Sequence, residues 1–347
     1  MSTQPAPSPL LDLPDAVAGE GVDAPVAAHY GSLYGEQRSL AAGEGFVDLS
    51  HRDVVRVSGP DRLSWLHSLT TQHLEALPSG RPTVALILSP QGHVEHAMYG
   101  IDDGEAFTAH VEPGAGGALV AWLDSMRFTM RVEVADVSDE LAVAWRPARV
   151  ARVSTGSTGD ADSTGDADST AGVGWADGYE LVPRAKLSGY AEAAGPPCGM
   201  WAFEALRIAR GEPRLGHDTD ARTIPNEAGW IGTGVHLDKG CYRGQETVAR
   251  VHNLGRPPRR LTLLHLDGSE NRLPAGKSEL HLASDADGRA VGFVGSSARH
   301  HELGPIALGM VKRNVALEVT LFADGLPASQ EVLVDPEAGL HVRPTLR

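Results

Sequence analysis

The sequence has little cysteine, few aromatic residues and no long hydrophobic run. Its 347 residues include two cysteines, and the aromatic residues make up 5% of the chain. No apolar stretch approaches the roughly 18 residues that a membrane-spanning helix requires, and the N-terminus lacks the basic start and apolar core of a signal peptide. We therefore expect a cytoplasmic protein with no membrane partner, in which Cys198 and Cys241 remain free thiols.

Net positive charge and conventional metal motifs are also lacking. The formal net charge is -15, which opposes binding to nucleic acid, so we expect no direct nucleic-acid partner. No CxxC or HxxxH pair occurs, and His93 and His96 would point to opposite faces of a strand. The adjacent His300 and His301 lie in a loop-like stretch and are predicted to be solvated. The sequence therefore predicts no metal site.

Composition divides the chain into a tail, two regions and an insertion. Residues 1–25 are rich in proline and have little periodic apolar pattern, which predicts a disordered tail. Residues 154–170 repeat small and acidic types that cannot form a core, which predicts a flexible surface insertion. This insertion interrupts a first region, residues 26–256. Short strand-like segments separated by glycine, proline and aspartate predict a small barrel-like β domain at residues 257–347.

The first region mixes helices with antiparallel strands. Leu63, Leu66 and Leu69 recur at helical spacing, and "MWAFEALRIAR" predicts a second, longer helix. The apolar run at residues 83–88, the turn signal "SPQG" and the alternating "HVEHAMYG" together predict a β-hairpin. No regular βαβ repeat is present. The predicted fold class is therefore α+β.

The segment "KGCYRGQE", residues 239–246, places Cys241 between two cations. Lys239 and Arg243 would lower the pKa of the thiol, and a helix opening in "GQETVARV" would add the favourable field of a helix N-terminus. The two glycines of the segment permit a tight turn or a close approach of backbone. A lone cysteine is also commonly a small buried hydrophobic residue. Reactive and structural roles for Cys241 both remain open.

The charge balance reverses in and after this segment, in a chain that is acidic elsewhere. Six basic residues stand against Glu246, the one acid of the stretch: Lys239, Arg243, Arg250, Arg256, Arg259 and Arg260. Such a run can build a site for carboxylates or phosphates. It is equally typical of a solvated boundary between domains, where arginines pair with the acids of a neighbouring domain.

The octet resembles the signature of the YgfZ family, which are folate-binding relatives of the aminomethyltransferase (T protein) of the glycine cleavage system. It fits the pattern K-G-C-Y-x-G-Q-E throughout, with Lys239, Gly240, Cys241, Tyr242, Arg243, Gly244, Gln245 and Glu246. The likeness extends through "VSGPDRLSWLHSLTTQ", "LILSPQGHVEHAM", "ALRIARGEPRLG" and "ELGPIALGMVKR", and covers most of residues 27–345. It implies an aminomethyltransferase-like folate-binding fold followed by a C-terminal β-barrel domain.

The resemblance also implies tetrahydrofolate as the cofactor and a role in assembly or repair of iron–sulfur clusters, including those of enzymes that modify transfer RNA. Cys241, with Lys239 beside it, would carry this function, and the partners would be iron–sulfur proteins or assembly factors bound transiently. A chain with two cysteines cannot hold a conventional cluster alone, so any cluster would be shared with a partner or affected through folate. A polyglutamate tail on the folate would lie towards Arg250, Arg256 and Arg259.

Two positions depart from the pattern of the transferases. Those enzymes carry an acidic pair after a double glycine, whereas this chain reads "GHVEH" at residues 92–96 and retains one carboxylate, Glu95. They also tend to carry a folate-contacting glutamate where this chain has Ala209. One alternative function is a folate-dependent one-carbon transferase in which Glu95 contacts the cofactor as a substitute acid. Another is a folate-binding module in which Cys241 is structural.

Overall fold

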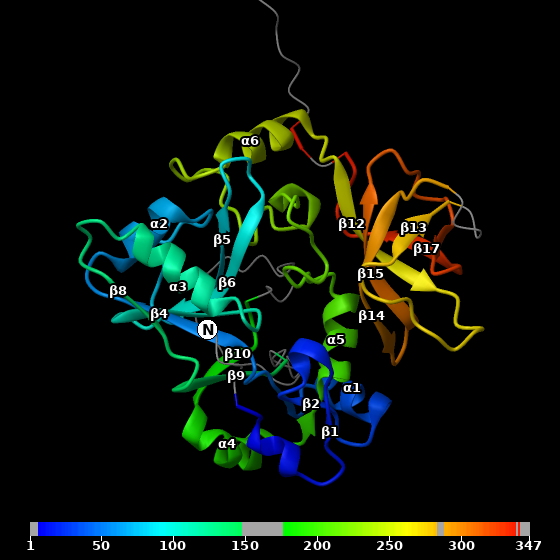
Figure 1. Ribbon diagram of the computed structural model, residues 1–347, viewed down its shortest axis with the longest axis horizontal. Helices are drawn as coiled ribbons and strands as arrows, with labels where there is room; N and C mark the ends of the chain where they lie inside the picture. Colours follow the sequence, from blue (N-terminus) through cyan, green and yellow to red (C-terminus); the bar gives the residue numbers. More distant parts are fainter. Residues whose placement is uncertain (1–5, 148–175, 283–287, 338, 341–347) are drawn as a thin grey trace, which may run out of the picture.

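Three lobes surround a common centre in this protein (Figure 1). The computed structural model describes the whole chain except residues 1–5, 148–175, 283–287, 338 and 341–347. The predicted insertion at 154–170 lies outside the described residues. Two of the lobes combine a sheet with helices and the third is a barrel, in agreement with the predicted α+β class.

The first lobe is a five-stranded antiparallel sheet with two helices on one face. The strands follow the order β5 (Thr83–Leu88), β6 (Val94–Asp102), β7 (Ala106–Val111), β4 (Asp53–Ser58) and β8 (Glu133–Asp136). Helices α2 (Arg62–Leu69) and α3 (Gly116–Ser125) pack on residues such as Ile87, while Leu86 faces Trp230 on the other side. Both faces of β5 are buried, which explains its continuous apolar run. The predicted hairpin is confirmed by the pairing of β5 with β6.

The second lobe is built on a four-stranded sheet. Its order is β10 (Tyr179–Pro183), β9 (Leu141–Trp145), β3 (Phe46–Asp48) and β11 (Pro197–Cys198), with only the β3–β11 pair parallel among the described strands. The helices of this lobe are α1 (Leu33–Ala41), α4 (Leu187–Ala194) and α5 (Met200–Ala209). Phe203 of α5 packs against Trp145 with ring centroids 5.5 Å apart. Helix α5 therefore packs into the hydrophobic core of the lobe.

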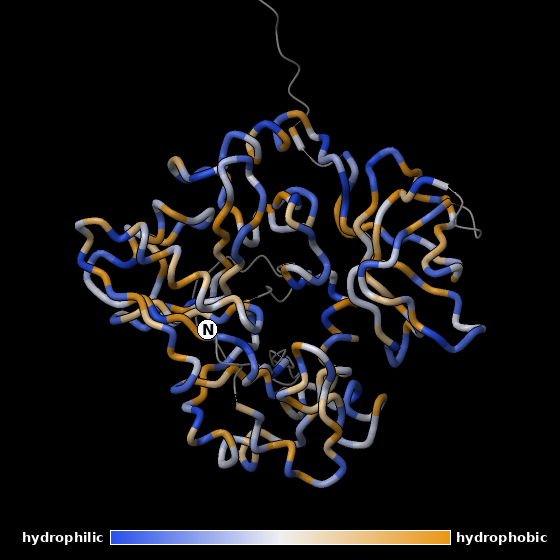
Figure 2. Tube along the Cα trace, viewed as in Figure 1, coloured by the Kyte–Doolittle hydropathy of each residue, from blue (hydrophilic) through white to orange (hydrophobic). Residues whose placement is uncertain are grey.

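The third lobe is a closed barrel of six strands. They are β12 (Arg259–Leu266), β15 (Gly304–Lys312), β14 (Gly292–His300), β13 (Glu279–His281), β16 (Leu321–Ala323) and β17 (Leu326–Val332), in that order around the barrel. Leu264 belongs to the inner core, whereas Leu263 packs outwards with Ile208 of α5. This alternation follows from the two-residue period of a strand, and Figure 2 shows hydrophobic residues along β12 and β15. The barrel confirms the predicted C-terminal β domain.

The N-terminal segment is ordered where the structure describes it, so the prediction of a disordered tail at 1–25 is wrong for residues 6–25. These residues and the next four form a strap that carries the 3₁₀ helices Pro9–Asp12 and Gly21–Asp23 and the short strands β1 (Val17–Ala18) and β2 (Ala27–His29). The Ser8 hydroxyl donates to Asp48, and Leu10 is buried. Proline content did not reveal these contacts because their partners lie far along the chain.

Arg214 joins the strap to two of the lobes. Its side chain is 3% exposed, and its guanidinium lies 3.0 Å from Asp23 of the strap, 2.8 Å from Glu112 after β7 and 3.3 Å from Glu204 on α5. Burial would raise the pKa of Glu112, but Arg214 and Arg52 outweigh burial and hold that pKa at about 2. The buried charges are therefore present as ion pairs, and each is compensated by a partner.

Arg207 carries the same network into the barrel. It lies on α5, is 1% exposed, and places its guanidinium 2.5 Å from Glu204 and 2.8 Å from Asp218. The other oxygen of Asp218 accepts a hydrogen bond of 2.6 Å from the backbone N–H of Ser296 on β14. A continuous chain of charged contacts thus connects the strap, both sheet lobes and the barrel.

Replacement of Arg214 should destabilise the protein strongly. Arg214→Ala leaves three carboxylates without their shared cation, and we expect a loss of about 3–5 kcal/mol in the free energy of unfolding, measured by urea denaturation. Arg56→Ala is the matched control, because Arg56 pairs with Glu140 at a partly exposed site and should cost less than about 1 kcal/mol. Equal effects for the two variants would contradict a central role for Arg214.

The network should also make stability depend on acid. The pKa of Glu112 falls from 4.5 to about 2 on folding, so its ionised form stabilises the fold fully above about pH 4.5 and this contribution is lost as the pH falls towards 2. In Glu112→Gln the unfolding free energy should fall less steeply as the pH is lowered. The slope should be smaller by the amount that corresponds to the uptake of about one proton on unfolding. The control Glu140→Gln, at an exposed pair, should keep the wild-type slope. Urea unfolding at a series of acidic pH values measures both, and identical slopes for all three proteins would contradict this prediction.

Candidate functional site

The octet 239–246 forms the loop that leads into α6 (Gln245–Leu254), and the predicted helix start is confirmed. Lys239 is buried, and its ammonium donates to the backbone carbonyls of His67 and Thr70, the latter at 2.5 Å, at the C-terminal end of α2. A cation there satisfies carbonyls that the helix leaves unpaired and complements the helix dipole. Burial lowers the pKa of Lys239 to about 8. Lys239 therefore anchors the loop to the first lobe.

Two glycines bring this loop into contact with the β5–β6 hairpin. At Gly244 φ is +80°, and a Cβ there would lie 2.5 Å from the Ser89 carbonyl oxygen and 2.9 Å from the Cα of Gly92. At Gly92 φ is +84°, and a Cβ would lie 2.8 Å from that of Thr247. Both conformation and space thus require glycine at these two positions. Gly240 differs, because an added Cβ would meet nothing within 4 Å.

Arg243 and Glu95 form an ion pair across the same contact. The guanidinium lies 2.7 Å from the carboxylate, and the two side chains are 34% and 37% exposed. The guanidinium also lies 5.9 Å from the ring centroid of Trp122 on α3. The structure brings together these two predicted site residues and uses the carboxylate as a partner for arginine. Glu95 would have to leave this pair before it could serve a substrate as an acid.

Cys241 is exposed in the loop ahead of the first turn of α6. Tyr242 is half-buried and packs with the cluster that contains Val248 and Trp230. Gln245 begins the helix and Glu246 lies exposed in its first turn, where a carboxylate is favoured by the dipole. The neighbours of Cys241 are therefore fixed by packing and helix formation, while its thiol faces solvent.

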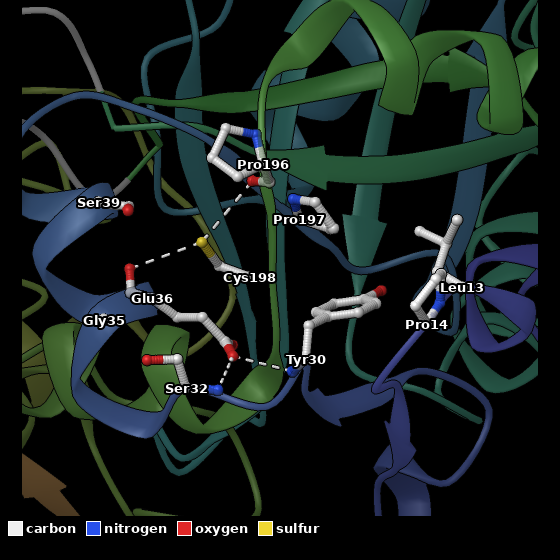
Figure 3. A pocket seen from close by; sticks show the side chains of 10 residues that line it. All are labelled: Leu13, Pro14, Tyr30, Ser32, Gly35, Glu36, Ser39, Pro196, Pro197 and Cys198. Carbon is white, nitrogen blue, oxygen red and sulfur yellow. Dashed lines mark hydrogen bonds between the residues drawn. The ribbon is translucent and has the colours of Figure 1, made fainter.

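Cys198 differs from Cys241 in access. It lies on β11, is 1% exposed, and its thiol donates to the carbonyl oxygens of Glu36 at 3.5 Å and Pro196 at 3.8 Å (Figure 3). Burial, with the nearby Glu36 carboxylate, raises the pKa of Cys198 to about 12. Cys198 matches the small buried hydrophobic type of cysteine. Cys241 does not.

The basic run does not form one patch. Arg259 is held by two carboxylates, at 2.6 Å from Asp220 and 2.8 Å from Glu227, and links that segment to the barrel. Arg250 and Arg256 are exposed and form no ion pair within the part of the chain that the structure describes. Of the three arginines predicted to face a folate tail, Arg250 and Arg256 keep their charges available and Arg259 is already neutralised.

A cavity of about 360 Å³ lies between the second lobe and the barrel. Its lining includes Trp145, Ala209, Arg210, Glu212 and His301. The Arg210 guanidinium lies 5.0 Å from the ring centroid of Trp145 and 3.2 Å from the Glu212 carboxylate. An indole, small apolar side chains and a few convergent polar groups suit a flat polar heterocycle. Ala209, where the transferases tend to carry a glutamate, is on this wall.

Burial of two histidines at this cavity was missed by the sequence analysis. The prediction of solvated side chains at His300 and His301 is wrong for His301, whose side chain is 9% exposed, and His300 is also buried. The imidazole Nδ1 of His301 has no hydrogen-bond partner among the described residues. A polar turn gives no signal for such burial, because the covering groups lie on α1 and α5, far away in the sequence.

The described residues contain no group of three or more His, Cys, Asp or Glu side chains able to hold a metal ion. The His73 ring meets that of His67 edge to face at 4.8 Å and that of His236 at a tilt at 5.4 Å between centroids, without forming such a group. Across the same described ranges no helix is long and apolar enough to cross a membrane.

The glycine contact predicts a sharp difference between two neighbouring substitutions. Gly244→Ala forces a left-handed residue against the hairpin, and we expect a loss of about 1–3 kcal/mol in unfolding free energy. Faster alkylation of Cys241 by iodoacetamide should accompany this loss, since the loop is released. The control is Gly240→Ala, because a Cβ at Gly240 would meet nothing within 4 Å. It should change the unfolding free energy by less than about 0.5 kcal/mol. A Gly244→Ala protein as stable as Gly240→Ala would show that the contact is not needed.

Comparison with known proteins places this geometry in context. No family model matches the chain. It is 28% identical over 293 residues to "Putative transferase At1g60990, chloroplastic" of Arabidopsis thaliana, with 78% of this chain and 66% of that protein covered, so it spans just under two thirds of that relative. It is 27% identical over 327 residues to the aminomethyltransferase of Cutibacterium acnes, with 83% and 84% covered.

One solved structure agrees with these relatives in fold. The crystal structure of the glycine cleavage system aminomethyltransferase T from Bartonella henselae matches with a TM-score of 0.74 and 18% identity, over 95% of this chain and 97% of that one. At this identity the match establishes the fold and leaves activity open. The chain has the aminomethyltransferase fold with its C-terminal barrel, as the sequence resemblance predicts.

Proposed function

We propose that this protein binds a tetrahydrofolate and supports the assembly or repair of iron–sulfur proteins through the thiol of Cys241. One observation carries the proposal: Cys241 is exposed on a loop that three separate contacts hold in place. Lys239, Gly244 and Arg243 each have a structural partner. The thiol is the reactive group of the octet that packing does not use.

Folate binding is supported by the fold and by the cavity beside Ala209. A relative named aminomethyltransferase is 27% identical in sequence and a solved aminomethyltransferase has the same architecture, and the resemblance implies tetrahydrofolate for both branches. The ring of a pterin is flat and carries both hydrogen-bond donors and acceptors. Trp145 and Leu206 offer apolar walls, and Arg210 and Glu212 offer polar atoms. These residues fit the ring, and bound tetrahydrofolate would supply a carrier of one-carbon units.

The iron–sulfur part of the proposal concerns what one exposed thiol can do. A thiolate is the form of cysteine that binds iron or attacks sulfur. A single thiol cannot complete the four-cysteine ligation of a conventional cluster, and Cys198 is too buried to help. The remaining ligands would come from the partner, an iron–sulfur protein or an assembly factor that binds transiently. Such a partner would meet the face on which Cys241 lies.

The second candidate is a folate-dependent one-carbon transferase, which the names of the relatives favour. In that case Glu95 would act as the acid in place of the acidic pair of the transferases. Its ion pair with Arg243 argues against this role, because the carboxylate is already engaged. A transferase without an available carboxylate at this position would need another residue for proton transfer.

Substitution of Cys241 separates these functions. In cells that lack the native protein, Cys241→Ala should restore less than a tenth of the wild-type activity of a reporter iron–sulfur enzyme, while Asp238→Ala, an exposed control in the same loop, should restore it fully. Calorimetry with 5-formyltetrahydrofolate should give the same Kd for wild type and Cys241→Ala. Full restoration by Cys241→Ala would remove the thiol from the function. Loss of folate binding together with loss of restoration would instead indicate a thiol that supports the cofactor site.

A further inference from the structure

One side of helix α6 carries charge and apolar surface into solvent. Val248 is the buried residue of this helix and packs with Trp230. Successive residues of a helix turn by about 100°, so Arg250 and Leu254, two and six positions after Val248, point away from the core. Figure 1 shows α6 at the outer edge of the molecule, between the β5–β6 hairpin and β12. We call Arg250, Leu254 and the following Arg256 the α6 face.

The cations of the α6 face are available in a chain that is otherwise acidic. Arg250 and Arg256 are exposed and have no ion-pair partner among the described residues. Residues 247–266 contain no acid, whereas the whole chain has 45 Asp and Glu residues against 30 Lys and Arg residues. Glu246 lies one turn before Arg250, at the helix N-terminus, where the dipole stabilises its charge. A local excess of positive charge results on a protein with a net charge of -15.

The α6 face lies beside the exposed thiol and apart from the cavity at Ala209. Neither arginine is among the side chains that line that cavity. Cys241 stands four residues before Gln245, the first residue of α6, and the helix rises by about 1.5 Å per residue. One partner of a standard protein interface covers about 800 Å². A single partner can therefore contact the α6 face and the thiol at once.

Apolar side chains accompany these cations. Leu254 is 44% exposed at the end of α6, and Leu237, just before the octet, is 40% exposed. Arginine is enriched among the residues that contribute most to protein interfaces, and a patch of one charge selects a partner of the opposite charge. The surface that complements the α6 face is acidic, with an apolar patch opposite Leu254.

We propose that the α6 face docks an acidic surface of the iron–sulfur protein or assembly factor on which Cys241 acts. This inference rests on the proposed function and deepens it by naming the surface that binds the partner. The two arginines attract and orient the partner at the loop, and Leu254 adds buried apolar area once the proteins are in contact. Arg250 and Arg256 are thus binding residues for a protein and leave the folate untouched.

Thiol–disulfide exchange at Cys241 measures the local attraction. The probe is a short peptide with one cysteine among glutamates, activated as its mixed disulfide with thionitrobenzoate. The Cys241 thiolate attacks the peptide sulfur, a new disulfide forms, and thionitrobenzoate leaves as a coloured anion that reports the rate. Arg250→Glu with Arg256→Glu should slow this reaction about fivefold or more at low salt, and the difference should vanish at about 0.5 M salt.

Two exposed arginines elsewhere provide a control with the same change in net charge. Arg38 lies on α1 and Arg289 on the loop before β14. Arg38→Glu with Arg289→Glu should stay within about twofold of the wild-type rate, because these sites are far from the thiol. Arg250→Gln with Arg256→Gln removes the cations without adding acids, and should slow the reaction in the same direction by a smaller factor.

The same variants test docking in cells that lack the native protein. Arg250→Glu with Arg256→Glu should restore less than about a third of the wild-type activity of a reporter iron–sulfur enzyme, while the control pair restores it fully. Leu254→Gln removes apolar contact and no charge, so it should lower restoration and leave the peptide reaction unchanged. Thermal unfolding checks folding, and calorimetry with triglutamyl 5-formyltetrahydrofolate should give the wild-type Kd for every variant.

Three results would overturn this inference. Equal peptide rates and equal restoration in the two charge-matched pairs, with both folded, would remove the α6 face and leave the proposed function of Cys241 standing. Weaker binding of the triglutamyl folate by the Arg250 and Arg256 variants would show that these arginines hold the folate tail instead. Full restoration by Cys241→Ala would remove the proposed function and this inference with it.

Discussion

Two buried guanidinium groups, those of Arg207 and Arg214, hold the lobes of this protein in one arrangement. A buried cation is tolerated only when carboxylates surround it, and here the carboxylates come from the strap, from the end of β7, from α5 and from the loop that reaches the barrel. The strap and the two sheet lobes each deliver a charged group, and the barrel joins the network through the backbone N–H of Ser296. Helix α5 carries Arg207 and Glu204 on one side and Ala209 at its end, so the same network places the wall of the cavity.

The conformation of the octet around Cys241 is set by the contacts of its neighbours, and the charges beside the thiol serve those contacts. Lys239 caps α2, Gly244 admits the hairpin backbone, and Arg243 pairs with Glu95. The two cations that the sequence places beside Cys241 are thus directed at other partners. These three contacts hold the loop in place and leave the thiol of Cys241 exposed. That outcome agrees better with the proposed role of the Cys241 thiol than with acid catalysis by Glu95.

The residue pattern within short segments was sufficient to predict those elements that short-range periodicity determines. The apolar run at 83–88, the turn after it and the strands of the barrel follow from the two-residue period of a strand, and the start of α6 follows from the composition of the octet. The strap could not be predicted, since Leu10 and Asp23 are ordered by residues far away in sequence. Burial of His301 was hidden for the same reason.

In the candidate site, too, the sequence reveals the features of each short segment and hides the contacts between distant segments. Glycines at 92 and 244 stand in the two segments that carry the family resemblance, yet nothing in either segment indicates that they touch. The ion pair of Glu95 with Arg243 likewise joins positions that sequence spacing treats as independent. Sequence reasoning could therefore name Cys241 and its neighbours as a unit. It could not separate the anchors from the reactive group.

The two departures from the transferase pattern have one physical meaning. At Glu95 a carboxylate is retained but paired with Arg243, and at Ala209 the chain has a methyl group, so the carboxylates that line that cavity come from other positions such as Glu212. Both changes preserve contacts suited to binding and weaken those suited to moving a one-carbon group. A scaffold altered in this way is better suited to holding folate than to transferring its one-carbon group, and under the proposed function the exposed thiol of Cys241 would carry the chemistry.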